Sequence, residues 1–196
     1  MSFHGQQVIP VAKNKNQYNL FLESSFQYGV YLDMDIAQLK PVSQLAKQHN
    51  KNILLHADMI QGLKNDEYST EYLCQEIKPF GIISTKPNVI LKARQKGVLT
   101  VQRIFLLDSQ ALQKSYSILK HTKADYVEIL PGIIPGFIRK MAEDHTIPIL
   151  TGGLVQTRDE VTCALNAGAR AVTTSRVALW KSFESPVTSI TKAEGG

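Results

Sequence analysis

The feature that most constrains this chain is a regular alternation of short apolar runs with longer amphipathic segments. The apolar runs begin at Val8, Tyr28, Asn52, Gly81, Leu99, Ala124, Ile147 and Ala171. Such runs, rich in β-branched residues and bounded by turn residues, are typical of buried strands. Between several of them, apolar residues recur three and four positions apart, which predicts helices over residues 37–50, 67–77, 88–96 and 110–121.

This alternation predicts an α/β fold with parallel strands joined by crossover helices, because mostly apolar strands need cover on both faces of their sheet. Eight units favour a single compact (βα)8 TIM-barrel-like domain, although 196 residues is short against the roughly 250 typical of that architecture. An open flavodoxin-like sheet is the alternative. We expect the barrel to span residues 1–182, and residues 183–196 to form a flexible C-terminal tail.

Composition narrows the class of protein further. Hydrophobic residues make up 43% and charged residues 20%, which is ordinary for a globular domain. Cys74 and Cys163 are far apart and offer neither a metal-ligand spacing nor a disulfide framework, which predicts a reduced, cytoplasmic protein. We expect no signal peptide and no membrane span. A net charge of +5 permits a polyanionic partner, but the basic residues are scattered.

The last two apolar runs end in residues suited to binding phosphate. In (βα)8 barrels, phosphate groups often sit on the loops after the seventh and eighth strands. Here the seventh run ends in Thr151-Gly152-Gly153 and the eighth in Thr173-Thr174-Ser175-Arg176. Together they offer close backbone amides, hydroxyls and a guanidinium at the start of a helix. The plainer alternative is that the glycines make a tight turn and the hydroxyls cap a helix.

Other polar residues fall at the predicted ends of strands and should converge on the same mouth. They are His56, Asp58, Lys86, Arg103 and Glu128. Lys86 and Arg103 suit the charge of a phosphorylated polyol, and Asp58 and Glu128 suit its hydroxyls. Strand periodicity predicts that Lys86, together with Ser84, points into the barrel top. As alternatives, Lys86 and Glu128 could form a buried ion pair, and His56 could be a satisfied core histidine.

The same residues leave an enzyme open as an alternative. Lys86 and Glu128 would then act as acid and base on a small sugar or polyol phosphate. However, the sequence has no nucleophile elbow and no Walker-type glycine loop. We predict no cofactor and no metal, although Asp33, Asp35 and Asp58 could in principle collect a divalent ion.

Several longer strings give the chain a family resemblance. They are HADMIQGL from His56, GIISTKPNVILKA from Gly81, TVQRIFLLDS from Thr100, YVEILPGIIP from Tyr126 and TGGLVQT from Thr151. Over about residues 9–180 the chain resembles the glycerol uptake operon antiterminator regulatory proteins. The resemblance implies a non-enzymatic barrel that responds to glycerol 3-phosphate and binds the leader of glycerol operon mRNA to prevent premature termination.

The resemblance also implies which residues contact the ligand. They are Lys86, Arg103, Glu128, Gly152, Gly153 and Ser175, to which the strand-end positions add Asp58 and Thr174. The chain departs from the family pattern at Thr151, where Ala is usual, and in its TTSR string, where the pattern has STS. The first departure adds a hydroxyl without removing the glycines, so it bears on the ligand's contacts and not on the existence of the site.

The RNA surface is harder to place from sequence. No aromatic pair of the RRM type, KH-type loop or arginine-rich arm is present. The basic segments carrying Lys92, Arg94 and Lys96, and Arg139 and Lys140, are the candidates. A homodimer would strengthen such a weak patch by avidity. A third reading is a protein-interaction scaffold that has lost its ligand, and it predicts no stabilisation by any phosphate compound.

Overall fold

The computed structural model describes residues 3–32 and 34–184, so Asp33 and the tail from residue 185 lie outside the described residues. Eight parallel strands close into a barrel in chain order. They are β1 (Val8–Ala12), β2 (Tyr28–Tyr31), β3 (Asn52–His56), β4 (Gly81–Ser84), β5 (Leu99–Phe105), β6 (Tyr126–Leu130), β7 (Ile149–Gly152) and β8 (Ala169–Thr174). Closure comes from pairing of β1 with β8, so the predicted barrel is confirmed and the open sheet is wrong.

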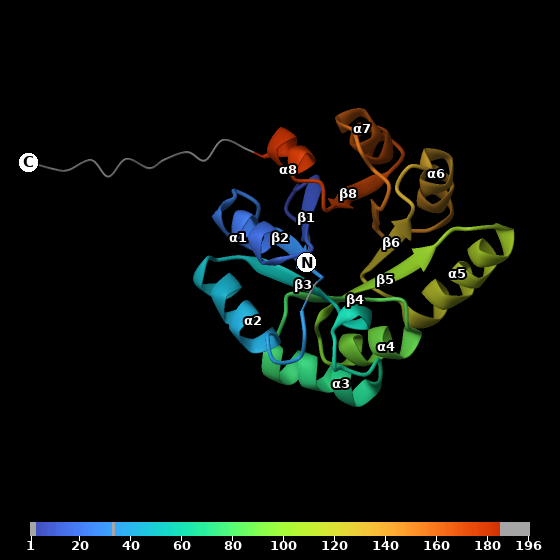
Figure 1. Ribbon diagram of the computed structural model, residues 1–196. Coiled ribbons are helices and arrows are strands. Elements are labelled where there is room, and N and C mark those ends of the chain that lie inside the picture. The colour runs from blue at the N-terminus through green and yellow to red at the C-terminus, as the bar shows by residue number, and fades with distance from the viewer. Residues whose placement is uncertain (1–2, 33, 185–196) are drawn as a thin grey trace, which may run out of the picture.

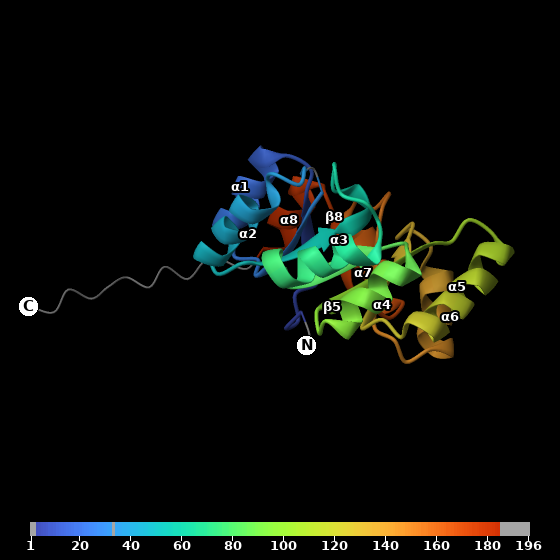
Figure 2. The same ribbon diagram turned by 90° about the horizontal axis from the view of Figure 1, so that it is seen from below.

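A helix follows each strand, and Figure 1, which looks along the barrel, shows the helices around it in chain order. They are α1 (Lys15–Glu23), α2 (Leu39–Gln48), α3 (Glu67–Tyr72), α4 (Pro87–Gln95), α5 (Ser109–Thr122), α6 (Pro135–Asp144), α7 (Arg158–Asn166) and α8 (Val177–Phe183). Figure 2 turns the barrel by 90°. The helix predicted over residues 67–77 is α3 continued by a π-helical turn, Leu73–Ile77. In the described part of the chain, no helix is long and apolar enough to cross a membrane.

Local signals fix where the helices begin and end. Asp108 caps α5 by accepting a hydrogen bond from the backbone N–H of Ala111 at 2.7 Å, as its position in the sequence predicts. After α4 and α7, Gly97 and Gly168 adopt φ values of 73° and 109°, which a side chain disfavours. α8 runs to Phe183, one residue past the boundary predicted for the barrel.

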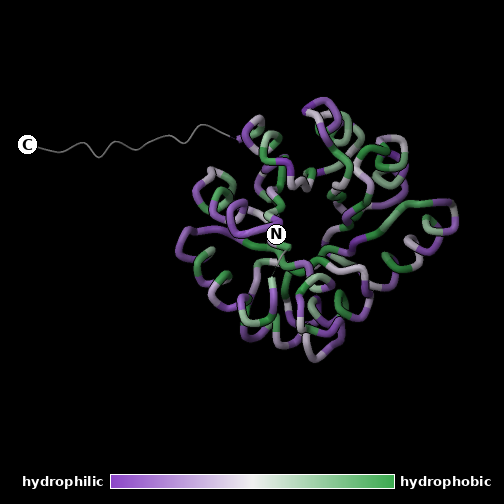
Figure 3. The backbone as a smooth tube through the Cα atoms, in the orientation of Figure 1, coloured by the Kyte–Doolittle hydropathy of each residue, from purple (hydrophilic) through white to green (hydrophobic). Residues whose placement is uncertain are grey.

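Two apolar clusters hold the barrel together, and they follow from strand periodicity. One lies inside the barrel and includes Ile9, Leu54, Ile83, Val101 and Leu150. The other contains the alternate strand residues and lies between the strands and the helices. Figure 3 shows hydrophobic residues on the strands and on the helices around them. Because both faces of the sheet are buried, alternation within a strand decides which polar side chains can face the mouth.

An aromatic group closes the N-terminal end of the barrel. The Phe3 ring packs edge-on against Tyr28 and Tyr126, with ring centroids 5.3 Å and 4.9 Å away, and Phe80 joins them at 6.2 Å. With this end closed by apolar side chains, the polar residues inside the barrel gather at the opposite end. That end is the mouth, where the strands end and the chain turns into the helices.

Candidate functional site

A cavity of about 550 Å³ lies at the mouth, over the ends of β1, β5, β7 and β8. Its polar lining includes Lys13, Arg103, Ser175 and Arg176, and Gly153 contributes backbone. Three cationic side chains therefore surround one small hollow. This arrangement is suited to an anionic ligand, because guanidinium and ammonium groups bind phosphate oxygens by charge-assisted hydrogen bonds.

Gly152, the last residue of β7, and Gly153, which follows it, are glycines for two different structural reasons. A Cβ on Gly152 would lie 2.1 Å from Thr173 Oγ1 and 2.6 Å from the Thr173 carbonyl oxygen, so only glycine lets β7 approach β8 this closely. Gly153 has φ of 73°, which favours glycine, and it lines the cavity. The tight-turn reading is thus correct for Gly153, and its backbone still faces the space that a ligand would occupy.

The residues after β8 form the opposite wall. Thr174 Oγ1 accepts a hydrogen bond from the backbone N–H of Arg176 at 3.2 Å, and the Thr174 carbonyl accepts one from Trp180 Nε1 at 2.7 Å. These bonds fix the turn that presents Ser175 and Arg176 to the cavity. Since α8 has seven residues, the charged side chains matter more here than a helix dipole.

Arg103 is held at the floor of the cavity by a buried carboxylate. Its Nε donates to Glu128 Oε2 at 2.6 Å, while Glu128 Oε1 accepts from Thr173 Oγ1 at 2.7 Å. Glu128 is fully buried, and Arg103 is 13% exposed. The carboxylate therefore orients the guanidinium toward the mouth, and both of its oxygens already have donors. This arrangement makes Glu128 a positioning residue for Arg103.

The alternative of a buried ion pair between Lys86 and Glu128 is wrong, because Arg103 pairs with Glu128 instead. Lys86 is exposed at the N-cap of α4 and does not line the cavity. The expected strand phase was also wrong, since Ile83 belongs to the cluster inside the barrel and Ser84 lies one position out of phase with it. Lys86 and Glu128, the acid and the base of the alternative enzyme, are therefore not paired.

Asp58 anchors the end of β4 and is not a wall of the cavity. Its Oδ2 accepts from the backbone N–H and the hydroxyl of Thr85, both at 2.7 Å, and Oδ1 accepts from the Ser84 hydroxyl. Ser84 Oγ in turn accepts from the backbone N–H of Lys86 at 3.0 Å. Asp58 thus fixes the turn between β4 and α4.

His56 lies inside the barrel and is not the satisfied core histidine that the alternative described. The side chain is 4% exposed, and neither ring nitrogen has a hydrogen-bond partner among the described residues. Burial, reinforced by the positive charge of Arg103, lowers the pKa of His56 to about 4, while Asp58 and Glu128 act in the opposite direction. The ring is therefore neutral at pH 7.

Three further residues complete the site, and none of them was among the individual ligand residues predicted from the sequence. Lys13 and Arg176 line the cavity, and Thr173 bonds to Glu128. Lys13 directly follows β1, so the rule that ligand-binding residues follow barrel strands would have found it. The guanidinium of Arg176 was part of the predicted phosphate-binding loop, and the structure places it in the cavity lining. The contact of Thr173 with Glu128, 45 residues earlier in the chain, has no sequence signal.

The aspartates proposed as an alternative metal site do not come together in the described structure. Asp35 Oδ1 accepts from the backbone N–H groups of Ala37 and Gln38 at 2.8 Å and 3.1 Å, and Asp58 is bound to the end of β4. Asp33 lies outside the described residues. Within residues 3–32 and 34–184, no group of three His, Cys, Asp or Glu residues could hold a metal ion.

The basic residues predicted to bind RNA divide into two kinds. Lys92 and Lys96 both pair with Glu71, Lys92 at 2.9 Å, and these contacts lower the pKa of Glu71 to about 2. Their charge is thus partly compensated. Arg94 is exposed on α4, and on α6 Arg139 and Lys140 are exposed.

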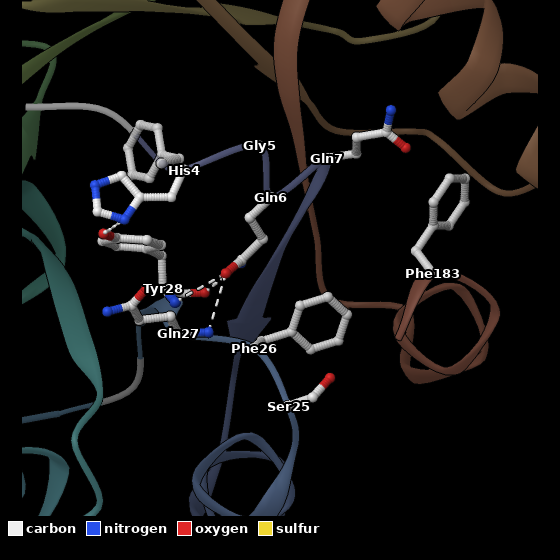
Figure 4. A pocket seen from close by; sticks show the side chains of 10 residues that line it. His4, Gly5, Gln6, Gln7, Ser25, Phe26, Gln27, Tyr28 and Phe183 are labelled. Carbon is white, nitrogen blue, oxygen red and sulfur yellow. Dashed lines mark hydrogen bonds between the residues drawn. The ribbon is translucent and has the colours of Figure 1, made fainter. Parts of the chain in front are cut away.

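A second hollow, of about 350 Å³, opens at the closed end of the barrel (Figure 4). Phe3, His4, Tyr28 and Phe183 line it, and the Gln6 carboxamide oxygen accepts from the backbone N–H groups of Gln27 and Tyr28. Among the residues that the structure describes, no Lys or Arg lines this hollow. The mouth cavity is therefore the better candidate for a phosphate-bearing ligand.

The fold and the cavity together define a (βα)8 barrel with a cationic mouth suited to a small anionic ligand. The chain belongs to the glycerol-3-phosphate responsive antiterminator family, whose sequence profile matches residues 8–180. This places it in a family of regulators named for antitermination and for their response to glycerol 3-phosphate.

Individual relatives agree with this assignment. The glycerol uptake operon antiterminator regulatory protein of Listeria monocytogenes is 42% identical, with a TM-score of 0.90 over 92% of this chain and 98% of that one. A glycerol uptake operon antiterminator-related protein from Thermotoga maritima is 26% identical, with a TM-score of 0.80 over 90% and 98%. An uncharacterised Escherichia coli protein, YgcP, is 28% identical over 88% of this chain and 91% of its own length.

More distant barrels share the fold alone. Deoxyribose phosphate aldolase from Aeropyrum pernix is 15% identical, with a TM-score of 0.69 over 91% of this chain and 90% of that one.

Proposed function

We propose that this protein is a transcription antiterminator that binds glycerol 3-phosphate at the barrel mouth and, when loaded, binds the leader of a glycerol operon mRNA and prevents premature termination. The observation that carries the proposal is the cavity ringed by Lys13, Arg103 and Arg176 in a chain of this family. A phosphate dianion offsets the mutual repulsion of these cations, and the cavity is large enough for a three-carbon polyol phosphate.

The ligand acts by selecting an arrangement of the mouth loops. The residues after β7 and β8 lie on separate turns, and a phosphate bridging Gly153 backbone, Ser175 and Arg176 would hold both turns in one geometry. A ligand shifts such an equilibrium only by its differential affinity for the two arrangements. Leader RNA should therefore tighten glycerol 3-phosphate binding by the same factor by which glycerol 3-phosphate tightens RNA binding.

The activity is regulatory, and glycerol 3-phosphate is an effector that needs no metal or other cofactor. We place the protein in the cytoplasm, where it would meet nascent mRNA.

A homodimer would present two RNA-binding surfaces and raise the avidity for one transcript. Sedimentation with and without glycerol 3-phosphate measures that association directly.

A thermal unfolding titration tests the ligand. Glycerol 3-phosphate should raise the unfolding temperature, because a ligand present at 100 times its Kd stabilises the folded state by about 2.7 kcal/mol. Glycerol and inorganic phosphate at the same concentrations are the controls. No shift with any of the three would support the scaffold reading, and turnover of a phosphosugar would support the enzyme.

A further inference from the structure

Three neighbouring hollows at the closed end of the barrel share lining residues and together make up one groove-like surface. They have volumes of about 440 Å³, 740 Å³ and 410 Å³, and Pro148 lines all three. His145 lines the second and third. The groove runs below the starts of β5 to β8, at the opposite end of the barrel from the mouth cavity. We call it the basal groove.

Four exposed cations surround the basal groove. Arg94 is in the last turn of α4, Lys120 is in the last turn of α5, Lys123 follows α5, and Arg170 is on β8. Each of them lines one of the hollows. Within the described chain none of the four forms an ion pair, unlike Lys92 and Lys96, which lie against Glu71. The charge of these four residues is thus free to act on a partner.

The carboxylates of the basal groove are mostly committed to the protein itself. Asp125 Oδ2 accepts from the backbone N–H and the hydroxyl of Thr100, at 2.8 Å and 2.7 Å. Asp144 accepts from the Tyr116 hydroxyl at 3.1 Å. Glu143, at the edge of the third hollow, is the remaining acid. The groove therefore carries four cations that form no ion pair within the described residues, while two of its three acids are hydrogen-bonded to other residues of the protein.

The largest hollow also carries an aromatic pair. The rings of Tyr116 and His145 lie with centroids 4.7 Å apart and planes inclined by 52°. Both side chains are partly exposed and line the hollow next to Lys120 and Lys123. Aromatic rings beside cations are how proteins bind single-stranded nucleic acid, because bases stack on the rings while phosphates meet the charges.

We propose that the basal groove is the surface that binds single-stranded RNA. This proposal rests on the proposed function, which does not say where on the protein RNA binds. The basal groove is the surface that we assign to that role. Phosphates lie along Arg94, Lys120, Lys123 and Arg170, and an unstacked base packs against Tyr116 and His145. The ligand and the RNA then occupy opposite ends of the barrel and never touch. Coupling between them passes through the strands and helices that join the two ends.

The test compares two variants that each remove two positive charges. Lys120→Gln/Arg170→Gln acts on the basal groove, and Arg139→Gln/Lys140→Gln removes exposed cations from α6. Binding of a random-sequence, single-stranded 40-nucleotide RNA pool is measured with saturating glycerol 3-phosphate over a range of salt concentrations. The groove variant should bind about tenfold more weakly, and its log–log salt slope should fall by about 1.4, or 0.7 for each lost phosphate contact. The α6 variant should retain the wild-type slope.

Two further measurements distinguish failure of the proposed RNA surface from failure of the proposed function. The thermal shift with glycerol 3-phosphate should be unchanged in the groove variant, since the mouth is intact. Ultraviolet crosslinking of RNA to the wild-type protein should label peptides containing Tyr116 or His145, whether or not the variant folds. Labelling at the mouth or on α6, or an unchanged salt slope in the groove variant, would overturn the surface alone. Wild-type protein that binds no RNA while still responding to glycerol 3-phosphate would overturn the RNA half of the proposed function.

Discussion

Substituting Gly152 by Ala tests whether contact between β7 and β8 builds the mouth. The added Cβ would lie 2.6 Å from the Thr173 carbonyl oxygen, which belongs to the backbone and cannot rotate away. The strands must therefore separate, and overpacking of this kind costs about 1–3 kcal/mol. The shift also moves the Thr173 hydroxyl from Glu128, a hydrogen bond to a charged group worth about 1.5–3 kcal/mol. We expect the free energy of unfolding to fall by about 3 kcal/mol.

Two other glycines provide matched controls for the same substitution. Ala at Gly153 meets Leu130 Cδ2 at 3.1 Å but must adopt φ of 73°, which costs about 1–2 kcal/mol. Ala at Gly136, in α6, meets nothing within 4 Å and should stabilise the protein by about 0.5–1 kcal/mol. The expected order of stability is Gly136→Ala, wild type, Gly153→Ala and Gly152→Ala, from highest to lowest.

Urea unfolding followed by circular dichroism measures this order, with the slope of each transition checked against the wild type. Glycerol 3-phosphate affinity, measured on the same proteins, should fall for Gly152→Ala and stay unchanged for Gly136→Ala. If Gly152→Ala unfolds within about 0.5 kcal/mol of the wild type, the close approach of the two strands is not a constraint and the reasoning fails.

Three further predictions concern buried groups. Arg103→Met leaves Glu128 as an unpaired buried charge, so it should cost about 3–5 kcal/mol of stability and abolish glycerol 3-phosphate binding; normal stability in urea would argue against the buried pair. The folded-state pKa of His56, about 4, lies below its unfolded value, so the unfolded chain binds more protons between pH 6.5 and 4. Stability should therefore fall by up to about 3 kcal/mol as the pH drops through this window, and acid titration of His56→Leu should lose that component. Cys163 is exposed, whereas burial raises the pKa of Cys74 to about 11. A thiol reagent at pH 8 should thus modify Cys163 alone in the folded protein, and rapid labelling of both would contradict the packing around Cys74.

The sequence predicted the order and type of the elements because the signals for them are local. β1 to β5 begin at the predicted residues, and local residue types at Asp108, Gly97 and Gly168 set the start of α5 and the ends of α4 and α7. Strand and helix periods reflect which side chains must be buried, so they survive in the sequence without any knowledge of the neighbours. The positions of the mouth loops after β7 and β8 follow from the same order.

Pairings between strands were decided only by the tertiary structure. Arg103 and Lys86 are both basic residues at predicted strand ends. However, β5 and β6 pair with Arg103 opposite Glu128, whereas Lys86 is exposed at the N-cap position of α4. Asp58 is hydrogen-bonded to the end of β4, and neither ring nitrogen of His56, inside the barrel, has a hydrogen-bond partner among the described residues. Register and strand phase set these contacts. A shift of one residue turns a side chain to the other face, and nothing local in the sequence fixes which residue on a neighbouring strand lies opposite.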